Sequence, residues 1–561
     1  MQRRILFRQI LLLPSLRSKN PAPARLLVRH ARLASQSRPQ LPFLSTPLAK
    51  NHQFRYLTTE RKRWLVYEVY LGFKYTVYIW AIIGCLVVAY WSVQQEWLER
   101  KYPTPHEWGF ITRLRFRIAK WGPDRTDWAE TDWVVIGEYA KNVIERLEDR
   151  NIEGGGLEDL TEGGIWIDGV GESGYDITAK SEPWQRGYYE ALMLGAKAAE
   201  QLDDQVVDKT RHLVFPASTI IGPSNPNPKP IPFGAQKAPL EKDCERAYEE
   251  PDTFYMRILT TRGFSSRQKM NAALAYASWL DFKGVPEAAL RMYDWALSIA
   301  SENLPPTEVP YDPKSFVLRD DARAPSMNVL DALTALATHK ARNEDVATAL
   351  PIFLSILRAR RSLLEPHRGS TASYEDETPS DSPWAMRNIL STVKRLAAPP
   401  AYPPPPPNGE SPPVRDAKER CEEAALNVYI GEMIYASKGR EDGLAWTREA
   451  VDLAEEQLHK LEPTETEAKQ TCKECLSSGL ENWAKMVSRL AREEREKEEA
   501  NRANSSNGRG AWFGLWGDGR QETPGRWAAE ENVVKERTRR AQEVLDELET
   551  PGTTLGSIFS T

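Results

Sequence analysis

The sequence predicts an all-α protein in which a single transmembrane helix precedes an array of helical hairpins interrupted by long Pro-rich insertions. Three observations lead to this expectation. An uncharged apolar run occupies residues 75–93, small and large apolar residues recur at helix-pair spacing after residue 130, and Pro-rich runs separate those helical stretches. A hydrophobic content of 41% together with 40 prolines in 561 residues fits one or two ordered bodies carrying Pro-rich connections.

Residues 1–59 are expected to be a mitochondrial presequence. The segment carries 11 Lys or Arg residues and no Asp or Glu, and Leu, Ser, Ala and Pro fill most of the space between them. An Arg-rich, acid-free segment can form a basic amphipathic helix that import receptors bind and the inner-membrane potential draws inward. The alternatives are a disordered basic arm and a secretory signal. No small-residue cleavage site follows the apolar residues 5–13, which disfavours the secretory signal.

Charge divides the chain into a basic front and an acidic body. Residues 1–63 contain 14 Lys or Arg against one acidic residue, whereas residues 64–561 contain 60 basic and 78 acidic residues, a net charge of −18. Binding to phosphates needs clustered Lys and Arg. Nucleic acid is therefore not expected as a partner of the body.

Residues 75–95 are expected to form the transmembrane helix. No charge occurs between Lys74 and Glu96, and about 20 helical residues cross about 30 Å of hydrocarbon. Aromatic residues lie near both ends, as at membrane interfaces: Tyr75, Tyr78 and Trp80, then Tyr90, Trp91 and Trp97. A buried core helix is the alternative, but it would be unusually long and apolar on all sides.

The charges beside this run predict its orientation. The segment 60–74 contains Arg61, Lys62, Arg63 and Lys74, whereas Glu96 and Glu99 come first on the other side. The more basic flank stays on the matrix side. We therefore expect residues 60–74 to be a matrix-side basic segment, and the juxtamembrane segment 96–130 and everything after it to lie in the intermembrane space.

Helical hairpins are expected throughout residues 131–490. In 273–303, Gly284 is at a turn and Tyr293 follows between the small residues Ala289 and Ala296, with Ala277 before the turn. These are the offsets of the 34-residue tetratricopeptide pattern. The small residues let antiparallel helices approach closely, and the aromatic side chain fills the space between neighbouring hairpins.

The same frame recurs three times, which predicts a tetratricopeptide-like α-solenoid. The alternative is an unrelated all-α bundle. One earlier hairpin is split, with helices at 133–149 and 184–202 around a Gly-rich insertion, 151–182. The residues at matching positions are Leu333, Leu336, Ala337, Ala349, Phe353 and Ile356 in 327–361; Ile430 to Tyr435, Gly443, Thr447 and Ala450 in 424–458; and Ala191, Gly195 and Ala198 in the split hairpin.

Polar and Pro-rich insertions are expected on the surface of this array. Gly222–Pro232 cannot be helical and should run extended or as polyproline II. Glu365–Pro383 is rich in Ser, Thr and acid, and Ala398–Pro413 is rich in Pro. The five consecutive prolines, Pro403 to Pro407, are interpreted as part of a loop or spacer rather than as an SH3-type ligand.

Residues 491–561 are expected to hold charged C-terminal helices and a disordered Trp-rich loop. One charged helix should run from about Glu465 to Arg502, and a last helix from Arg526 to Glu549. Between them, Trp512 to Trp516 form an aromatic motif with Gly-rich flanks. Exposed aromatics there would be a docking element or a plug for the solenoid groove. The alternative is packing on the solenoid's own end.

The sequence contains no pattern typical of catalysis, so no enzyme, cofactor site or metal site is expected. Cys472 and Cys475 form a CxxC on a predicted helix without a second such pair, and we expect small buried thiols. A Cys472–Cys475 bond or a cross-hairpin disulfide is the alternative. The seven histidines lack metal-ligand spacing, Gly154–Gly156 lacks the Lys of a phosphate loop, and carboxylate pairs are assigned to solvated helix faces.

This layout, with the juxtamembrane run Tyr102-Pro-Thr-Pro-His-Glu-Trp108, resembles the fungal tetratricopeptide-repeat adaptor subunit of the mitochondrial inner-membrane i-AAA protease. The resemblance covers most of residues 64–490. It implies that the protein binds unfolded or misassembled membrane proteins, together with a second adaptor subunit, and delivers them to the protease. The client-binding residues are not identified by it, and the Pro-rich inserts and residues 503–525 depart from that family.

Two other functions share part of this layout. An inner-membrane scaffold or assembly factor for respiratory complexes has the same topology. An outer-membrane import receptor also joins a span to such repeats, but its anchor normally begins at the extreme N-terminus without a cleavable presequence.

Overall fold

The computed structural model describes residues 59–125, 131–159, 166–167, 171–172, 174–231, 236–305, 308–320, 324–365, 402–437, 439–461, 466–506 and 525–549. The expected presequence, most of the insert Glu365–Pro383 and the Trp512 to Trp516 loop lie outside these ranges. The described part is mostly helical, with thirteen α-helices and seven short strands. The chain divides into two compact units, Met1–Val88 and Ala89–Thr561.

The helix α2, Thr59–Lys101, contains the expected transmembrane segment and is longer than predicted. It includes the basic segment 60–74 and continues past residue 95 without a break. Most of its large apolar side chains are exposed, with Phe73 and Trp80 each 69% accessible, whereas Leu98 near its end is buried. It is the one helix in the described ranges whose length and composition would allow it to cross a membrane.

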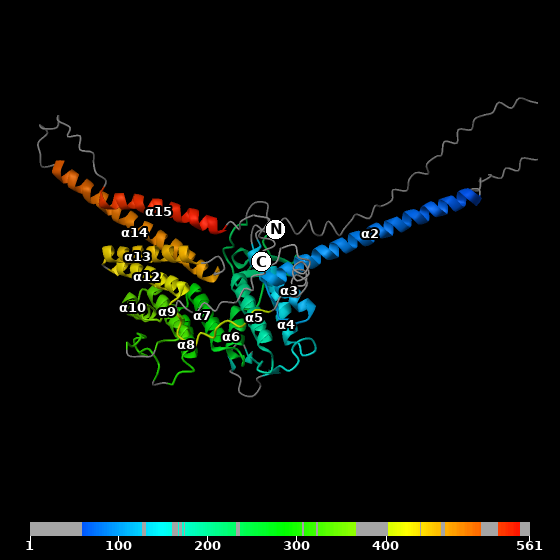
Figure 1. Cartoon of the computed structure of the whole chain (residues 1–561), viewed down its shortest axis with the longest axis horizontal. Helices are drawn as coiled ribbons and strands as arrows, with labels where there is room; N and C mark the ends of the chain where they lie inside the picture. The colour runs from blue at the N-terminus through cyan, green and yellow to red at the C-terminus, as the bar shows by residue number, and fades with distance from the viewer. Residues whose placement is uncertain are drawn as a thin grey trace, which may run out of the picture. The chain divides into compact units, whose positions relative to one another are not determined.

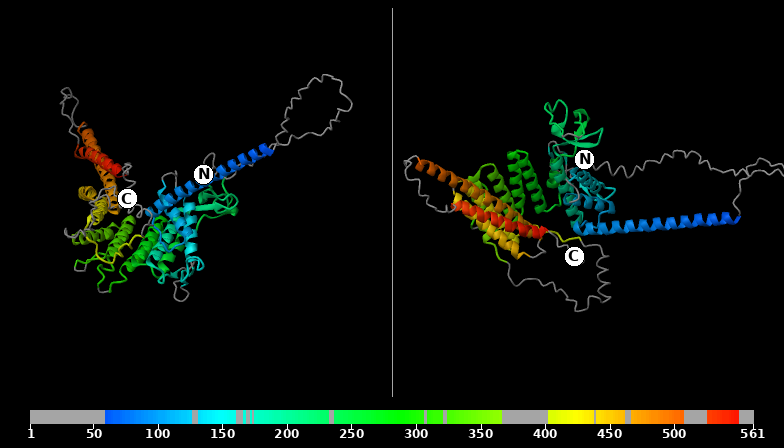
Figure 2. Two further views of the ribbon diagram at one scale, coloured as in Figure 1. Left: turned by 45° about the vertical axis from the view of Figure 1, so that its right-hand side comes forward. Right: turned by 90° about the horizontal axis from the view of Figure 1, so that it is seen from above.

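The helices of the second unit follow one another in chain order (Figure 1). Each contacts the next one along the chain, and α12 to α15, coloured yellow to red, lie side by side in both views of Figure 2. Their bounds are α3 Phe110–Trp121, α4 Trp133–Glu148, α5 Glu182–Leu202, α6 Pro251–Thr260, α7 Ser266–Phe282, α8 Pro286–Ala300, α9 Met327–Arg342, α10 Val346–Arg361, α12 Ala417–Ser437, α13 Arg440–Lys460, α14 Thr466–Ser506 and α15 Arg526–Glu549.

The helical pairs expected from residue spacing are present as α4 with α5, α7 with α8, α9 with α10 and α12 with α13. Gly284 ends α7 in the left-handed region at φ +75, where a side chain would be strained. The small residues at repeat positions are buried at these helix contacts, among them Ala277, Ala289, Ala337 and Ala349. The last helix, α15, has the predicted bounds.

The all-α prediction missed a minor β component. Strands β1 Glu158–Asp159 and β4 Tyr175–Asp176 pair within the expected insertion, as do β2 Trp166–Ile167 and β3 Gly171–Glu172. A three-stranded antiparallel sheet of order β6-β5-β7 follows α5, with β5 Gln205–Asp208, β6 Leu213–Pro216 and β7 Cys244–Arg246. Strands of two to four residues show too few alternations to be distinguished from loops in a sequence.

Three apolar clusters make up the core and follow the chain order of the helices. The first joins α3 to α7, the second joins α6 to α12, and the third joins α12 to α15. Helix α12 belongs to two of them, because Leu426 and Ile430 face the second cluster while Ala424 and Val428 face the third. A helix that is apolar on two sides must be buried between neighbours.

Helices α12 and α13 approach so closely that only glycine fits at their crossing. A Cβ on Gly443 would lie 2.5 Å from the Tyr435 backbone nitrogen and 2.6 Å from the Gly431 carbonyl oxygen. Both neighbours are backbone atoms, which cannot turn aside as a side chain would. Gly443 occupies a position that was expected to hold a small residue, and the contact with these two backbone atoms explains why a larger one does not fit.

Replacing Gly443 by Ala should separate α12 from α13. The overpacking should cost about 1–3 kcal/mol, which outweighs a gain in helix propensity of about 1 kcal/mol or less. The midpoint of thermal unfolding, followed by circular dichroism in detergent, should therefore fall by several degrees. Gly155→Ala is the control, since its Cβ would make only an ordinary contact at 3.8 Å with the Arg150 carbonyl oxygen. An unchanged midpoint for Gly443→Ala would contradict the close crossing.

Candidate functional site

The run Tyr102 to Trp108 forms the connection between α2 and α3. Trp108 is buried with its ring edge-on to Phe116, at 5.3 Å between centroids. A Cβ added to Gly187 on α5 would meet Trp108 and Pro105 at 2.6 and 2.7 Å, so the connection packs tightly on that helix. Tyr102 is buried as well and donates a hydrogen bond to Asp124.

A buried carboxylate, Glu99, joins the last turn of α2 to α3. Its Oε1 lies 2.9 Å from Arg113 Nη2 and accepts a hydrogen bond from the Thr104 hydroxyl at 2.8 Å, and it also pairs with Arg117. Glu99 and Arg117 are 3% and 4% exposed. Burial lowers the pKa of Arg113 and Arg117. A buried arginine, Arg117, and a partly buried one, Arg113, need an anionic partner, and Glu99 supplies it.

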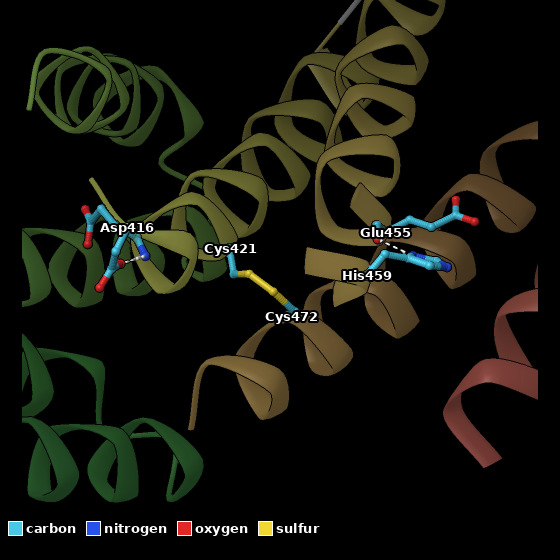
Figure 3. The surroundings of a disulfide bond; sticks show 6 residues. Asp416, Cys421, Glu455, His459 and Cys472 are labelled. Carbon is cyan, nitrogen blue, oxygen red and sulfur yellow. Dashed lines mark hydrogen bonds between the residues drawn. A yellow bond between two sulfur atoms is a disulfide. The ribbon is translucent and has the colours of Figure 1, made fainter. Parts of the chain in front are cut away.

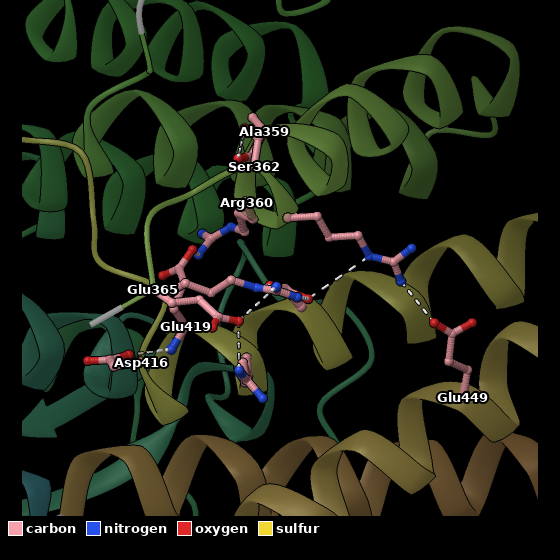
Figure 4. A network of polar contacts seen from close by, with 11 residues as sticks. Ala359, Arg360, Ser362, Glu365, Asp416, Glu419 and Glu449 are labelled. Carbon is pink, nitrogen blue, oxygen red and sulfur yellow. Dashed lines mark hydrogen bonds and ion pairs between the residues drawn. The ribbon is translucent and has the colours of Figure 1, made fainter. Parts of the chain in front are cut away.

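A second ionic network crosses the middle of the helical unit (Figure 4). Arg360 on α10 is 2% exposed and pairs with Glu419 on α12 and, at 3.4 Å, with Asp331 on α9. Asp331 also accepts from Arg267 on α7 at 2.7 Å. Four helices are therefore joined by one chain of ion pairs. Burial raises the pKa of Glu419, and Arg360 opposes that rise.

Assigning the carboxylates to solvated helix faces was therefore wrong at several positions. Glu99, Glu419 and Glu423 are each 3% exposed or less. Glu423 accepts from Arg415 through both oxygens, at 2.6 and 3.0 Å. The sequence shows these charges but not the partners, which lie on other helices or in loops, 59 residues away for Arg360 and Glu419.

The Pro-rich segment after residue 401 is an ordered strap rather than a simple spacer. From Tyr402 to Asp416 it runs without helix or strand, as predicted, and in Figure 1 its yellow trace passes from α12 toward α5. At its start, the Arg186 guanidinium on α5 donates to the Pro403 carbonyl at 2.6 Å and to the Pro404 carbonyl at 2.8 Å. The same guanidinium carbon lies 4.3 Å from the centre of the Tyr402 ring.

The second half of the strap is bound to the start of α9. The backbone N–H groups of Met327 and Asn328, unpaired within a helix at this position, donate to the carbonyls of Ser411 and Gly409 at 3.2 and 3.0 Å. The Asn328 side chain donates to the Asn408 carbonyl at 3.0 Å. Gly409 has φ +67, and a Cβ there would lie 2.2 Å from Asn328 Oδ1. Only glycine fits this contact.

Cysteine pairing differs from the expectation of small buried thiols. Cys421 on α12 and Cys472 on α14 form a disulfide, with 5.1 Å between their Cα atoms (Figure 3). This is the cross-helix alternative, and it excludes a Cys472–Cys475 bond. Cys475 is free and buried, and burial raises the pKa of its thiol to about 12. Such a thiol carries no thiolate near neutral pH and is unreactive.

Two of the described histidines, His339 and His459, take part in packing or hydrogen bonding. His339 is buried and its Nδ1 lies 2.8 Å from Asp281 Oδ1, beside the Tyr293 ring. His459 Nδ1 lies 2.7 Å from the Glu455 carbonyl oxygen (Figure 3). In the described ranges, no group of three or more His, Cys, Asp or Glu side chains is arranged to hold a metal ion.

Comparisons with known proteins give no family assignment. No protein-family model matches the chain, and no curated protein sequence matches it significantly. The residues themselves are thus the basis for a functional proposal. They define three polar sites: the Glu99 junction, the Arg360 network, and the strap bound by Arg186 and Asn328.

Glu99→Gln should destabilise the junction between α2 and α3. The amide retains its acceptor for Thr104, but Arg117 loses its anionic partner in a buried place, at a cost of about 3–5 kcal/mol. Thermal unfolding in detergent should show a lower midpoint, and limited proteolysis should cut faster between α2 and α3. Glu481→Gln is the control, since its pair with Lys485 is exposed on both sides and should leave the midpoint unchanged. Equal thermal midpoints and equal cleavage rates for Glu99→Gln and Glu481→Gln would contradict the role of Glu99 in stabilising the junction.

Reduction of the disulfide should loosen the contact of α14 with α12. The bond closes a loop with a sequence separation of 51 residues, for which the chain-entropy model gives about 4 kcal/mol. Non-reducing peptide mapping should recover the Cys421–Cys472 cross-link, and Cys421→Ser should lower the thermal midpoint. Cys244→Ser, at a free and partly exposed thiol, is the matched control. Alkylation of Cys472 in the native, unreduced chain would contradict the pairing.

Proposed function

We propose that the protein is a non-enzymatic adaptor of the mitochondrial inner membrane. Its α2 helix would cross the membrane with the N-terminus in the matrix, and the remaining helices would lie in the intermembrane space. There they would bind unfolded or misassembled membrane proteins and deliver them, with a second adaptor subunit, to the i-AAA protease. The observation that carries the proposal is an exposed apolar helix followed in the same chain by a row of helical hairpins.

The hairpins support a tetratricopeptide-like solenoid as the client-binding part. Helices pair in chain order, and the expected small and aromatic positions, such as Ala289 and Tyr293, are buried between them. In a solenoid, each repeat contacts only its neighbours, and the row presents an extended surface that can hold a peptide segment. Binding of a peptide segment to such a surface requires no catalytic residue.

The properties of α2 support the membrane anchor and its orientation. A helix that exposes Phe73, Trp80 and Tyr90 at 69% or more in water would be unfavourable, and lipid removes that cost. Lys and Arg before the apolar run favour the matrix side for the N-terminus. A membrane anchor also raises the effective concentration of membrane-bound clients near the hairpins.

The Cys421–Cys472 disulfide supports the intermembrane space over the matrix or the cytosol. Structural disulfides persist in oxidising compartments and are rare where thioredoxin and glutathione keep thiols reduced. This pair is deeply buried, with Cys421 and Cys472 both 0% exposed. Buried sulfurs are protected from exchange with external thiols.

Affinity purification tests the proposed partnership. The tagged full chain, isolated from detergent-solubilised mitochondria, should recover the i-AAA protease, and loss of the chain should lengthen the half-life of the protease's membrane clients. A tagged inner-membrane protein with one span and no hairpins is the control. Absence of the protease, with clients degraded at the normal rate without the chain, would overturn the proposal.

Two further results would favour the other functions. Co-migration with an assembly intermediate on native gels would indicate a scaffold for respiratory complexes. Digestion of the hairpin region by protease added to intact mitochondria would indicate an outer-membrane receptor, whereas an inner-membrane protein is cut only after the outer membrane is ruptured.

A further inference from the structure

The residues that bind the strap 402–411 offer only hydrogen-bond donors to its backbone. Arg186 donates to the carbonyls of Pro403 and Pro404, and α9 donates to those of Asn408, Gly409 and Ser411. In the described ranges, none of the backbone hydrogen bonds has an N–H of residues 402–411 as its donor. A binding surface made of hydrogen-bond donors favours a chain that offers carbonyl acceptors and has no backbone N–H groups. Consecutive prolines have this property.

The two halves of the strap are held differently. The half from Asn408 to Asp416 is fixed by Gly409 against Asn328 and by Arg415, whose guanidinium binds Glu423 and whose N–H donates to the Leu364 carbonyl. The half from Tyr402 to Pro407 has exposed prolines, and its polar contacts in the described residues are with Arg186. Residues 402–407 can therefore detach from α5 while residues 408–416 stay bound.

We propose that the Arg186 face of α5 is a binding site for polyproline segments, which the chain's own residues 402–407 occupy in the structure. The site would take a proline-rich segment of a partner protein when 402–407 is displaced. With residues 402–407 in place Arg186 is 8% exposed, and its Nε also lies 3.7 Å from the carboxylate of Glu182, one turn earlier on α5. The N–H groups of the planar Arg186 guanidinium donate to two successive carbonyls, and the flat face of the guanidinium lies against the Tyr402 ring.

Residues 402–407 then act as a competitor that is tethered to its own binding site. A segment tethered by a short linker competes at an effective concentration on the order of millimolar. A partner in solution at lower concentration is therefore excluded. A partner held nearby by other contacts, or a chain with a weakened strap, can bind. This site is independent of the protease partnership proposed above.

Fluorescence anisotropy with a labelled Tyr-Pro-Pro-Pro-Pro-Pro peptide tests the site on the full chain in detergent. The substitutions Tyr402→Gly, Pro403→Gly and Pro404→Gly remove the ring and the preformed polyproline conformation, which opens the site. The opened chain should bind the peptide at least tenfold more tightly than the native chain. A Tyr-Ala-Ala-Ala-Ala-Ala peptide should bind at least tenfold more weakly, because its N–H groups find no acceptors.

The role of Arg186 is tested in the opened chain. Arg186→Lys keeps the positive charge but lacks the planar pair of nitrogens that reach the two carbonyls and the flat face that stacks on the ring, and it should weaken binding of the proline peptide at least tenfold. Arg358→Lys is the matched control, since Arg358 is exposed on α10 and pairs with Asp320; this variant should bind as the opened chain does. An opened chain that melts as the native chain does but binds no more tightly, or an Arg186→Lys variant that binds equally well, would overturn the proposal.

The native chain provides a second test should the opened chain fail to fold. A Pro-rich peptide carrying a photoreactive phenylalanine in place of its tyrosine, added at millimolar concentration, should cross-link to residues 182–190 of α5. Unlabelled proline peptide should compete with this cross-link, and the alanine peptide should not. A native chain that gives no cross-link to α5, or one that both peptides displace equally, would also overturn the proposal.

Discussion

Burial of the Arg360 guanidinium constrains the arrangement of four helices. A charge that is 2% exposed costs several kcal/mol unless it is paired, so Glu419 and Asp331 must both reach it from α12 and α9. Asp331 is shared with Arg267 on α7, and Arg267 also donates to the Asn328 side chain at 2.9 Å. Asn328 in turn binds the strap. The position of the Pro-rich segment therefore depends on the same ion pairs that set the spacing of the helices.

The helices were predictable from the sequence because their signal is repeated and local. Small residues such as Ala277 and Ala289 recur at offsets that only paired helices explain, and the Arg526–Glu549 helix shows its apolar side in sequence. The transmembrane candidate was predictable for the same reason, although its helix extends further on both sides. The short strands β1 to β7 were missed, since two to four residues carry no periodicity.

The polar sites were not predictable, because their partners are far apart in sequence. Consecutive prolines predicted a loop or spacer but gave no sign that Arg186 would bind it. Glu99 and Glu419 look like surface charges in sequence, and only the structure shows the arginines beside them. The run Tyr102 to Trp108 is explained by packing of Trp108 and Pro105 on α5. That run therefore determines how α2 is joined to α3 and carries no information about the clients that the hairpins would bind.

The bond between Arg186 and the strap has a consequence for the order of folding. Arg186 and Pro403 are 217 residues apart in the chain, and contacts of such separation form late because the entropy of closing a long loop opposes them. During synthesis, which begins at the N-terminus, the α4–α5 hairpin is complete long before the strap emerges. Until then the Arg186 guanidinium is open to any other proline-rich segment nearby. The site that residues 402–407 cover in the folded chain is therefore accessible while the chain is still being made.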